Sequence, residues 1–367
     1  PGGSDGQAPG TLRMVTAMTL TGKRTKRDLF WLGLLALFAV IPLTPWFTRS
    51  TFAQHVMIQV LLYASMAQAW NILGGYCGQV SFGHSVFFGI GAYGTAMAVV
   101  KFGLIPWPGI LAGAVIAAVV AVAISYPCFK LKGHYFAIAT FAIVEIFNRL
   151  FMVWYWVGGA LGLDYGFTQP GWKNFVWYQT KDCCFYGVLL LFILVFGIVR
   201  WIEKHRFGFY LRAVREGQDT AESLGVDSTR VKLSAMALSA FLAALCGAFF
   251  AQYNYRVDPP MVMSLDMSMK FVLITILGGI GTLWGPLLGA AILIPLQEYT
   301  RAYLARLGPG IDLIIFGIII ILMMEFQPRG LMGILENLRK PSRALVKRSN
   351  TNSVQNNRLK GHLGGKQ

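Results

Sequence analysis

Long apolar segments recur along this 367-residue sequence, and they constrain the fold more than any other feature. Residues 183–199 and 233–250, for example, are each about as long as a helix that crosses a hydrocarbon layer roughly 30 Å thick. Only 13% of the residues are charged, whereas soluble domains carry about a quarter, so an ordinary soluble fold is excluded. Because lipid offers no partner to the backbone, each run is expected to be a helix. The sequence therefore predicts an all-α, polytopic membrane protein.

The apolar runs predict about ten transmembrane helices in one domain, residues 29–335. Polar segments flank this domain, and residues 1–28 and the basic tail 336–367 are both expected to be disordered. The expected spans are residues 29–47, 56–73, a third ending near 100, then 106–129, 135–157, 183–199, 233–253, 271–277, 287–296 and 311–324.

A polar segment, residues 216–227, lies between two of these runs and is central to the prediction of function. Basic residues surround it, and by the positive-inside rule a short basic loop stays in the cytoplasm. We define residues 203–232 as the polar loop, and both termini are expected on its side of the membrane. The same topology explains the net charge of +16 better than nucleic-acid binding does, since the basic residues lack interleaved aromatic residues. The surrounding basic residues are Arg200, Lys204, Arg206, Arg212, Arg215, Arg230 and Lys232.

Few charged residues fall inside the expected spans. Glu145 and Arg149 are four residues apart, so they share a helix face and are expected to form a structural intramembrane pair. The five cysteines show no metal-ligand spacing and are expected to be packing residues, so no metal site is predicted.

Two glycine-rich segments, residues 74–83 and 278–285, are expected to break helices at corresponding places in two repeat-like halves. Broken helices of this kind are typical of transporters, because unwound backbone is tolerated in a membrane only where it is buried or lines a cavity. The alternative is close helix packing by small residues. His84 could also simply hydrogen-bond within the protein, and this structural role is favoured. The candidate residues of a substrate pathway are Gly78, Gln79, Ser81, His84, Gly278, Gly279 and Thr282.

The sequence offers no energy source of its own. The glycine-rich tail at 361–367 has the wrong spacing for a phosphate-binding loop. The intramembrane carboxylates are few, and a charge-paired glutamate is a poor proton carrier. Active transport would therefore need a partner that supplies energy. Two other classes stay open at this point, an ion-coupled secondary transporter and a membrane anchor without a transport path.

Five motifs in order resemble the branched-chain amino acid ABC transporter permease family, and in particular the larger of its two permease subunits. The resemblance covers about residues 69–333. The motifs are residues 75–84, residues 135–140, Glu216 with Ala221 and Leu224-Gly225, residues 278–282 with Gly285-Pro286, and residues 328–331.

The resemblance implies a permease subunit of an importer in a bacterial inner membrane. Its expected partners are a second permease subunit, two cytoplasmic ATPase subunits and a periplasmic or surface-tethered substrate-binding protein. The chain itself would be no enzyme and would bind no cofactor, since ATP and Mg²⁺ would be bound by the ATPases.

The resemblance also implies that residues 216–227 form a coupling helix that docks on an ATPase. Ala221 and Gly225 would permit close approach, and the carboxylates would supply polar contacts; the alternative is a solvated surface helix. The expected coupling residues are Glu216, Gly217, Asp219, Ala221, Glu222, Leu224 and Gly225.

One stretch departs from the family pattern. Ala160 and Leu161 stand where members commonly carry a polar pair between glycines. Branched-chain or similar hydrophobic amino acids are the leading substrate, and urea, short amides or other amino acids are the alternatives.

Overall fold

The computed structural model describes residues 50–131, 134–165 and 181–304, and positions 314, 317–318, 321 and 330–333. The expected first span, most of the tenth, and both polar tails lie outside these residues. Among the described residues, six helical segments are long and apolar enough to cross a membrane, and the apolar helix at His84–Val100 is shorter. The prediction of a polytopic all-α membrane protein is confirmed, whereas the count of ten spans stays a prediction.

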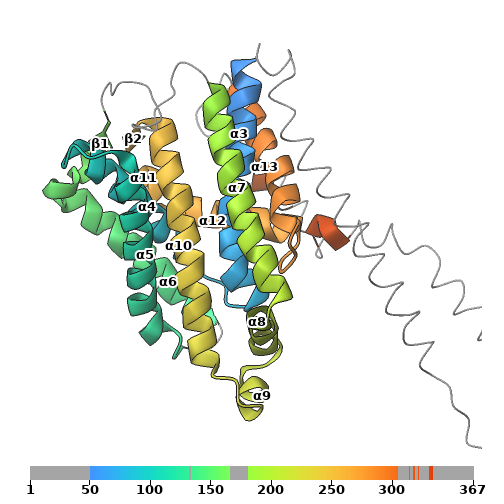
Figure 1. Ribbon diagram of the computed structural model, residues 1–367. Coiled ribbons are helices and arrows are strands. Elements are labelled where there is room, and N and C mark those ends of the chain that lie inside the picture. The colour runs from blue at the N-terminus through green and yellow to red at the C-terminus, as the bar shows by residue number, and fades with distance from the viewer. Residues whose placement is uncertain are drawn as a thin grey trace, which may run out of the picture.

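Helices dominate the described chain, with one short strand pair (Figure 1). The elements in chain order are α3 (Thr51–Asn71), η2 (Ile72–Tyr76), α4 (His84–Val100), α5 (Pro106–Cys128), α6 (His134–Val153), η3 (Tyr155–Val157), η4 (Gly159–Leu161), β1 (Leu163–Asp164), α7 (Lys181–Lys204), α8 (Arg206–Glu216), α9 (Gln218–Ser223), α10 (Ser228–Asn254), β2 (Arg256–Val257), α11 (Pro259–Val262), α12 (Leu265–Gly278) and α13 (Gly285–Leu304).

Helix α3 lies at the centre of the bundle. It packs against α7 and α13, and also against α10 and α12, so almost its whole surface is buried. Helices α4, α5 and α10 pack tightly on one another beside it. By contrast, α5 and α6 are buried along one side only. The bundle therefore has a closed centre and, at α5 and α6, faces that no described element covers.

The two ends of the bundle differ. Strand β1 follows the fifth expected span and pairs antiparallel with β2, which follows the seventh, with Leu163 opposite Val257 and Asp164 opposite Arg256. The loops that follow these two spans therefore meet at one end of the bundle. The polar loop, with α8 and α9, lies at the other end (Figure 1).

The helix of the fifth span ends earlier than expected, before a loop that contains three glycines. Helix α6 stops at Val153 instead of residue 157, and two short 3₁₀ turns follow it. Gly158, Gly159 and Gly162 have φ values of 97°, 56° and 74°, in the left-handed region that favours glycine. The chain reverses here, and Leu161 is left 82% exposed at the tip.

The eighth span also differs from the prediction. Helix α12 begins at Leu265, six residues before the expected start at 271. The reason is that the Ser264 side chain accepts a hydrogen bond from the Met267 amide and caps the helix. Lys270 therefore lies inside a membrane-spanning segment.

Close glycine contacts hold α4 against α10, and we expect Gly91→Leu to destabilise the protein. A Cβ added at Gly91 would overlap the backbone of Ala244. Forcing the two helices apart should cost about 1–3 kcal/mol or more. The measurement is the midpoint of thermal unfolding in detergent. Gly197→Leu is the matched control, because a Cβ at Gly197 meets nothing within 4 Å. Equal midpoints for the two variants would contradict the packing described here.

Candidate functional site

The polar loop folds into two short helices between two spanning ones. Helix α7 ends at Lys204, and α8 follows almost at once. Leu211 and Val214 of α8 are buried against the bundle, so α8 is anchored by an apolar stripe. A single residue, Gly217, then separates α8 from α9. The loop is thus a folded unit attached to the bundle.

A network of polar contacts holds α9 in place. The Gln218 amide nitrogen donates to Glu222 Oε1 at 3.0 Å, and the Ser228 hydroxyl donates to the same oxygen. Lys232 Nζ donates to Gln218 Oε1 at 2.7 Å, which ties α9 to α10. The hydrogen bonds from Ser228 and Gln218 hold the pKa of the Glu222 carboxyl below its ordinary value. The Glu222 carboxylate therefore already has hydrogen-bond donors within the chain.

Helix α9 presents one large apolar side chain to solvent. Leu224 is 79% exposed, whereas the neighbouring Ala221 is only 2% exposed. The Ala221 methyl group therefore faces the chain, and its expected role in close approach to an ATPase stays a prediction. Leu224 has the exposure that a docking residue needs.

The other expected coupling residues belong to the end of α8, to α9 and to the turn that follows it. Glu216 and Asp219 are exposed, and Gly225 ends α9 with a φ of 84°. Asp227 caps α10 by accepting a hydrogen bond from the Arg230 amide at 3.0 Å. A shallow hollow lies beside α9, lined by Glu222, Gly225, Val226, Asp227 and Ser228.

Arg215, at the end of α8, joins the polar loop to both glycine-rich segments. Its Nη1 donates to the Gly75 carbonyl oxygen at 2.7 Å. A Cβ on Gly78 would come within 2.9 Å of Arg215 Cγ, and one on Gly281 would overlap Arg215 Nη1. Gly78 and Gly281 also have positive φ values of 74° and 72°. Glycine at both positions leaves the space in which the arginine lies.

Asn71 ties the same two segments to each other. Its Nδ2 donates to the Thr282 carbonyl oxygen at 2.9 Å, and its Oδ1 accepts from the Gly281 amide at 2.9 Å. In addition, the Arg212 guanidinium lies 6.0 Å from the centre of the Tyr76 ring. The two helix breaks and α8 thus form one junction at the polar-loop end of the bundle, which we call the glycine junction (residues 71–78, 279–282, Arg212 and Arg215).

The candidate pathway residues divide into two groups. Gly78 and Thr282 belong to the glycine junction with Gly279, and Gly278 packs tightly against Gly285. Gln79 is half-buried beside Gly78. Ser81 and His84 are fully buried elsewhere, where Trp70 Nε1 donates to the Ser81 carbonyl at 2.7 Å.

His84 has the structural contacts that the sequence favoured. Its Nε2 lies 2.8 Å from the Ser239 hydroxyl, which in turn donates to the Ala69 carbonyl at 2.6 Å. The ring also packs edge-on against Phe87. This chain of contacts joins α4 to α10 and α3.

Within the described part of the chain, no group of three or more His, Cys, Asp or Glu side chains could hold a metal ion.

A sequence profile described as branched-chain amino acid transport system / permease component matches residues 52–324. The chain belongs to this family. It is thus a multi-pass membrane permease and not an enzyme. Membership also decides against the anchor and secondary-transporter alternatives, since the family is one of ABC transporter permeases.

Curated relatives agree with this membership. The chain is 26% identical to the high-affinity branched-chain amino acid transport system permease protein LivM of Salmonella typhimurium, over 85% of this chain and 76% of the relative. It is 24% identical to a probable LivM of Methanocaldococcus jannaschii, over 61% of this chain and 67% of that relative. It is also 26% identical to the high-affinity branched-chain amino acid transport system permease protein LivH of Salmonella typhimurium, over 40% of this chain and 46% of that relative.

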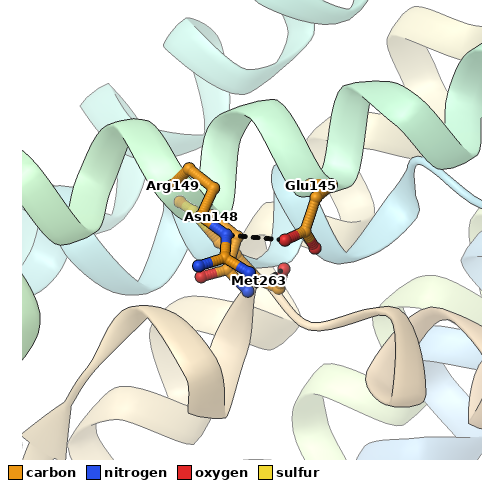
Figure 2. A network of polar contacts seen from close by, with 4 residues as sticks. All are labelled: Glu145, Asn148, Arg149 and Met263. Carbon is orange, nitrogen blue, oxygen red and sulfur yellow. Dashed lines mark hydrogen bonds and ion pairs between the residues drawn. The ribbon is translucent and has the colours of Figure 1, made fainter.

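The intramembrane pair expected in this permease is present. Arg149 Nε donates to Glu145 Oε1 at 2.7 Å on α6 (Figure 2). Asn148, between them, donates from Nδ2 to the Met263 carbonyl at 3.3 Å. However, the Glu145 side chain is 44% exposed and the Arg149 side chain is 74% exposed. The described part of the bundle therefore does not enclose the pair.

Sequence reasoning missed Arg215 and Asn71 as parts of the site. Arg215 counted only as one of the basic residues that set the topology, and Asn71 was one polar residue at the end of an apolar run. The available signal was their position, since Asn71 lies three residues before one glycine-rich segment and Arg215 lies two residues before Gly217, which precedes α9.

Proposed function

We propose that this permease imports branched-chain or similar hydrophobic amino acids, driven by ATPase subunits that dock on α9. The observation that carries the proposal is the continuous contact from α9 through α8 and Arg215 to both glycine-rich segments. The family match and the LivM and LivH relatives support the substrate class and a second permease partner. The remaining partners are two cytoplasmic ATPases and an external binding protein.

In this proposal, α9 is the coupling helix and Leu224 is its docking residue. An exposed apolar side chain on a short helix fits a groove on a partner. Glu216 and Asp219 supply exposed carboxylates for polar contacts with the ATPase. Glu222 stabilises α9 through its hydrogen bond with Gln218. Since the polar loop is basic, it faces the cytoplasm of a bacterial cell, in the inner membrane, and both termini lie on that side.

The mechanism is alternating access, in which the ATPases move α8 and α9 as they close. Arg215 contacts both glycine-rich segments, so a displacement of α8 reaches the ends of α3 and α12 directly. Gly78 and Gly279 are then places where the backbone changes direction between the two states. A shift between such states needs only a few kcal/mol of differential binding.

The test is purification of the tagged permease in nanodiscs, followed by identification of the co-purifying proteins and an assay of ATP hydrolysis. We expect a second permease and ATPases, with hydrolysis stimulated by leucine, isoleucine or valine in the presence of the binding protein. Stimulation by urea or short amides instead would change the substrate. Recovery of the chain without ATPases would overturn the proposal.

A further inference from the structure

Helix α6 carries its charges on the side that faces away from the described bundle. Its buried residues are Phe136, Thr140, Val144 and Asn148, which form one stripe at four-residue spacing. At 3.6 residues per turn, Glu145 and Arg149 lie about 140° and 180° around the helix from Thr140. The ion pair is therefore on the outward face of α6, in agreement with its exposure.

This ion pair lies within a membrane-spanning helix. Glu145 is about 17 Å from the start of α6 and about 12 Å from its end, at 1.5 Å per residue. Arg149 is one turn closer to the end, where a long side chain can reach the interface. Glu145 has no such route. Charged side chains at this depth face protein or a water-filled passage because lipid leaves them unsolvated.

The neighbouring helix α5 differs in this respect. Its most exposed large side chains, at 53–63%, are Leu111, Val115, Ile116, Val119 and Tyr126, and none of them is charged. Such a face suits lipid. The contrast distinguishes two uncovered helices, of which only α6 displays a charged pair.

We infer that the outward face of α6, centred on Glu145 and Arg149, is the surface that contacts the second permease subunit. The occupant follows from charge, since lipid supplies neither a polar group nor a water-filled passage opposite the pair, whereas a second spanning protein against this face supplies one or the other. The inference rests on the proposed function, which requires a second permease beside this one. It also gives Glu145 and Arg149 a role at an interface, in addition to their contact with each other.

The test places a photo-crosslinking amino acid at Ile146 or at Val119 in the assembled complex in native membranes. The two positions are matched, with exposed fractions of 62% on α6 and 63% on α5. Crosslinks from Ile146 to the second permease are expected, whereas Val119 should crosslink to lipid. Equal yields at both positions, or crosslinks from Ile146 only to lipid or to another segment of this chain, would overturn the inference.

A second measurement uses the ion pair itself. The double variant Glu145→Leu with Arg149→Leu makes this face of α6 apolar. It removes the charged groups that polar side chains of the second permease would contact. We expect at least a fivefold lower recovery of the second permease, at normal membrane abundance of this chain. Unchanged recovery contradicts the inference. If the unmodified chain recovers no second permease, the proposed function fails instead, so the two failures are distinguishable.

Discussion

Leu224→Glu is expected to remove the ATPases from the complex and to abolish ATP-driven uptake. The side chain is the most exposed large apolar group of the polar loop. A buried apolar contact at the centre of an interface is worth roughly 2 kcal/mol or more, which corresponds to about a 30-fold loss of affinity, and a buried carboxylate adds a desolvation cost. The measurement is the amount of ATPase that co-purifies with the tagged permease.

Leu161→Glu is the matched control for this variant. Leu161 is 82% exposed against 79% for Leu224, but it lies two residues before β1, which is at the opposite end of the bundle from α9 (Figure 1). Its substitution should leave ATPase recovery unchanged. If Leu224→Glu retains the ATPases as well as Leu161→Glu does, then α9 does not dock through Leu224.

Arg215→Ala is expected to separate ATP hydrolysis from transport. The variant keeps Leu224 and the α9 network, so the ATPases should still dock. It loses the hydrogen bond to Gly75 and the packing against Gly78. Coupling free energies between sites are typically 1–3 kcal/mol, so uptake per ATP hydrolysed should fall at least about fivefold. The readout is labelled amino acid transported per phosphate released in proteoliposomes.

Two further variants serve as controls for Arg215→Ala. Arg215→Lys keeps the charge and a donor, and should restore part of the coupling. Arg230→Ala removes an exposed arginine whose partner is Asp227, on the same loop, and it should leave the ratio near wild type because exposed pairs contribute little. If Arg215→Ala transports as many molecules per ATP as Arg230→Ala, the glycine junction is not the coupling route.

Much of the fold follows from the sequence because lipid allows few solutions. An apolar run of about twenty residues has to be a helix, so α3, α5, α7 and α10 were predictable within a few residues. Helix ends were harder. Helix α6 ends where the backbone of Trp154 becomes extended, and the start of α12 depends on the Ser264 cap. Both are local effects that an apolar count does not detect.

The site was predictable in its parts but not in its assembly. Glycine content indicated both helix breaks, yet their contact depends on Asn71, which reaches across about 210 residues of sequence to Gly281. The burial of Ala221 and the exposure of Leu224 likewise depend on how α9 packs. A six-residue helix is too short for sequence periodicity to define its buried face. Charge patterns indicated the Glu145 and Arg149 contact but not the direction in which it faces.

Uptake into proteoliposomes shows whether ATP hydrolysis at the polar loop drives amino acid import. The complex is reconstituted with binding protein on one side and ATP on the side of the polar loop, and labelled leucine is followed. We expect accumulation that requires ATP and is unaffected by ionophores. Accumulation that proceeds without ATP and collapses with the ion gradient would contradict it.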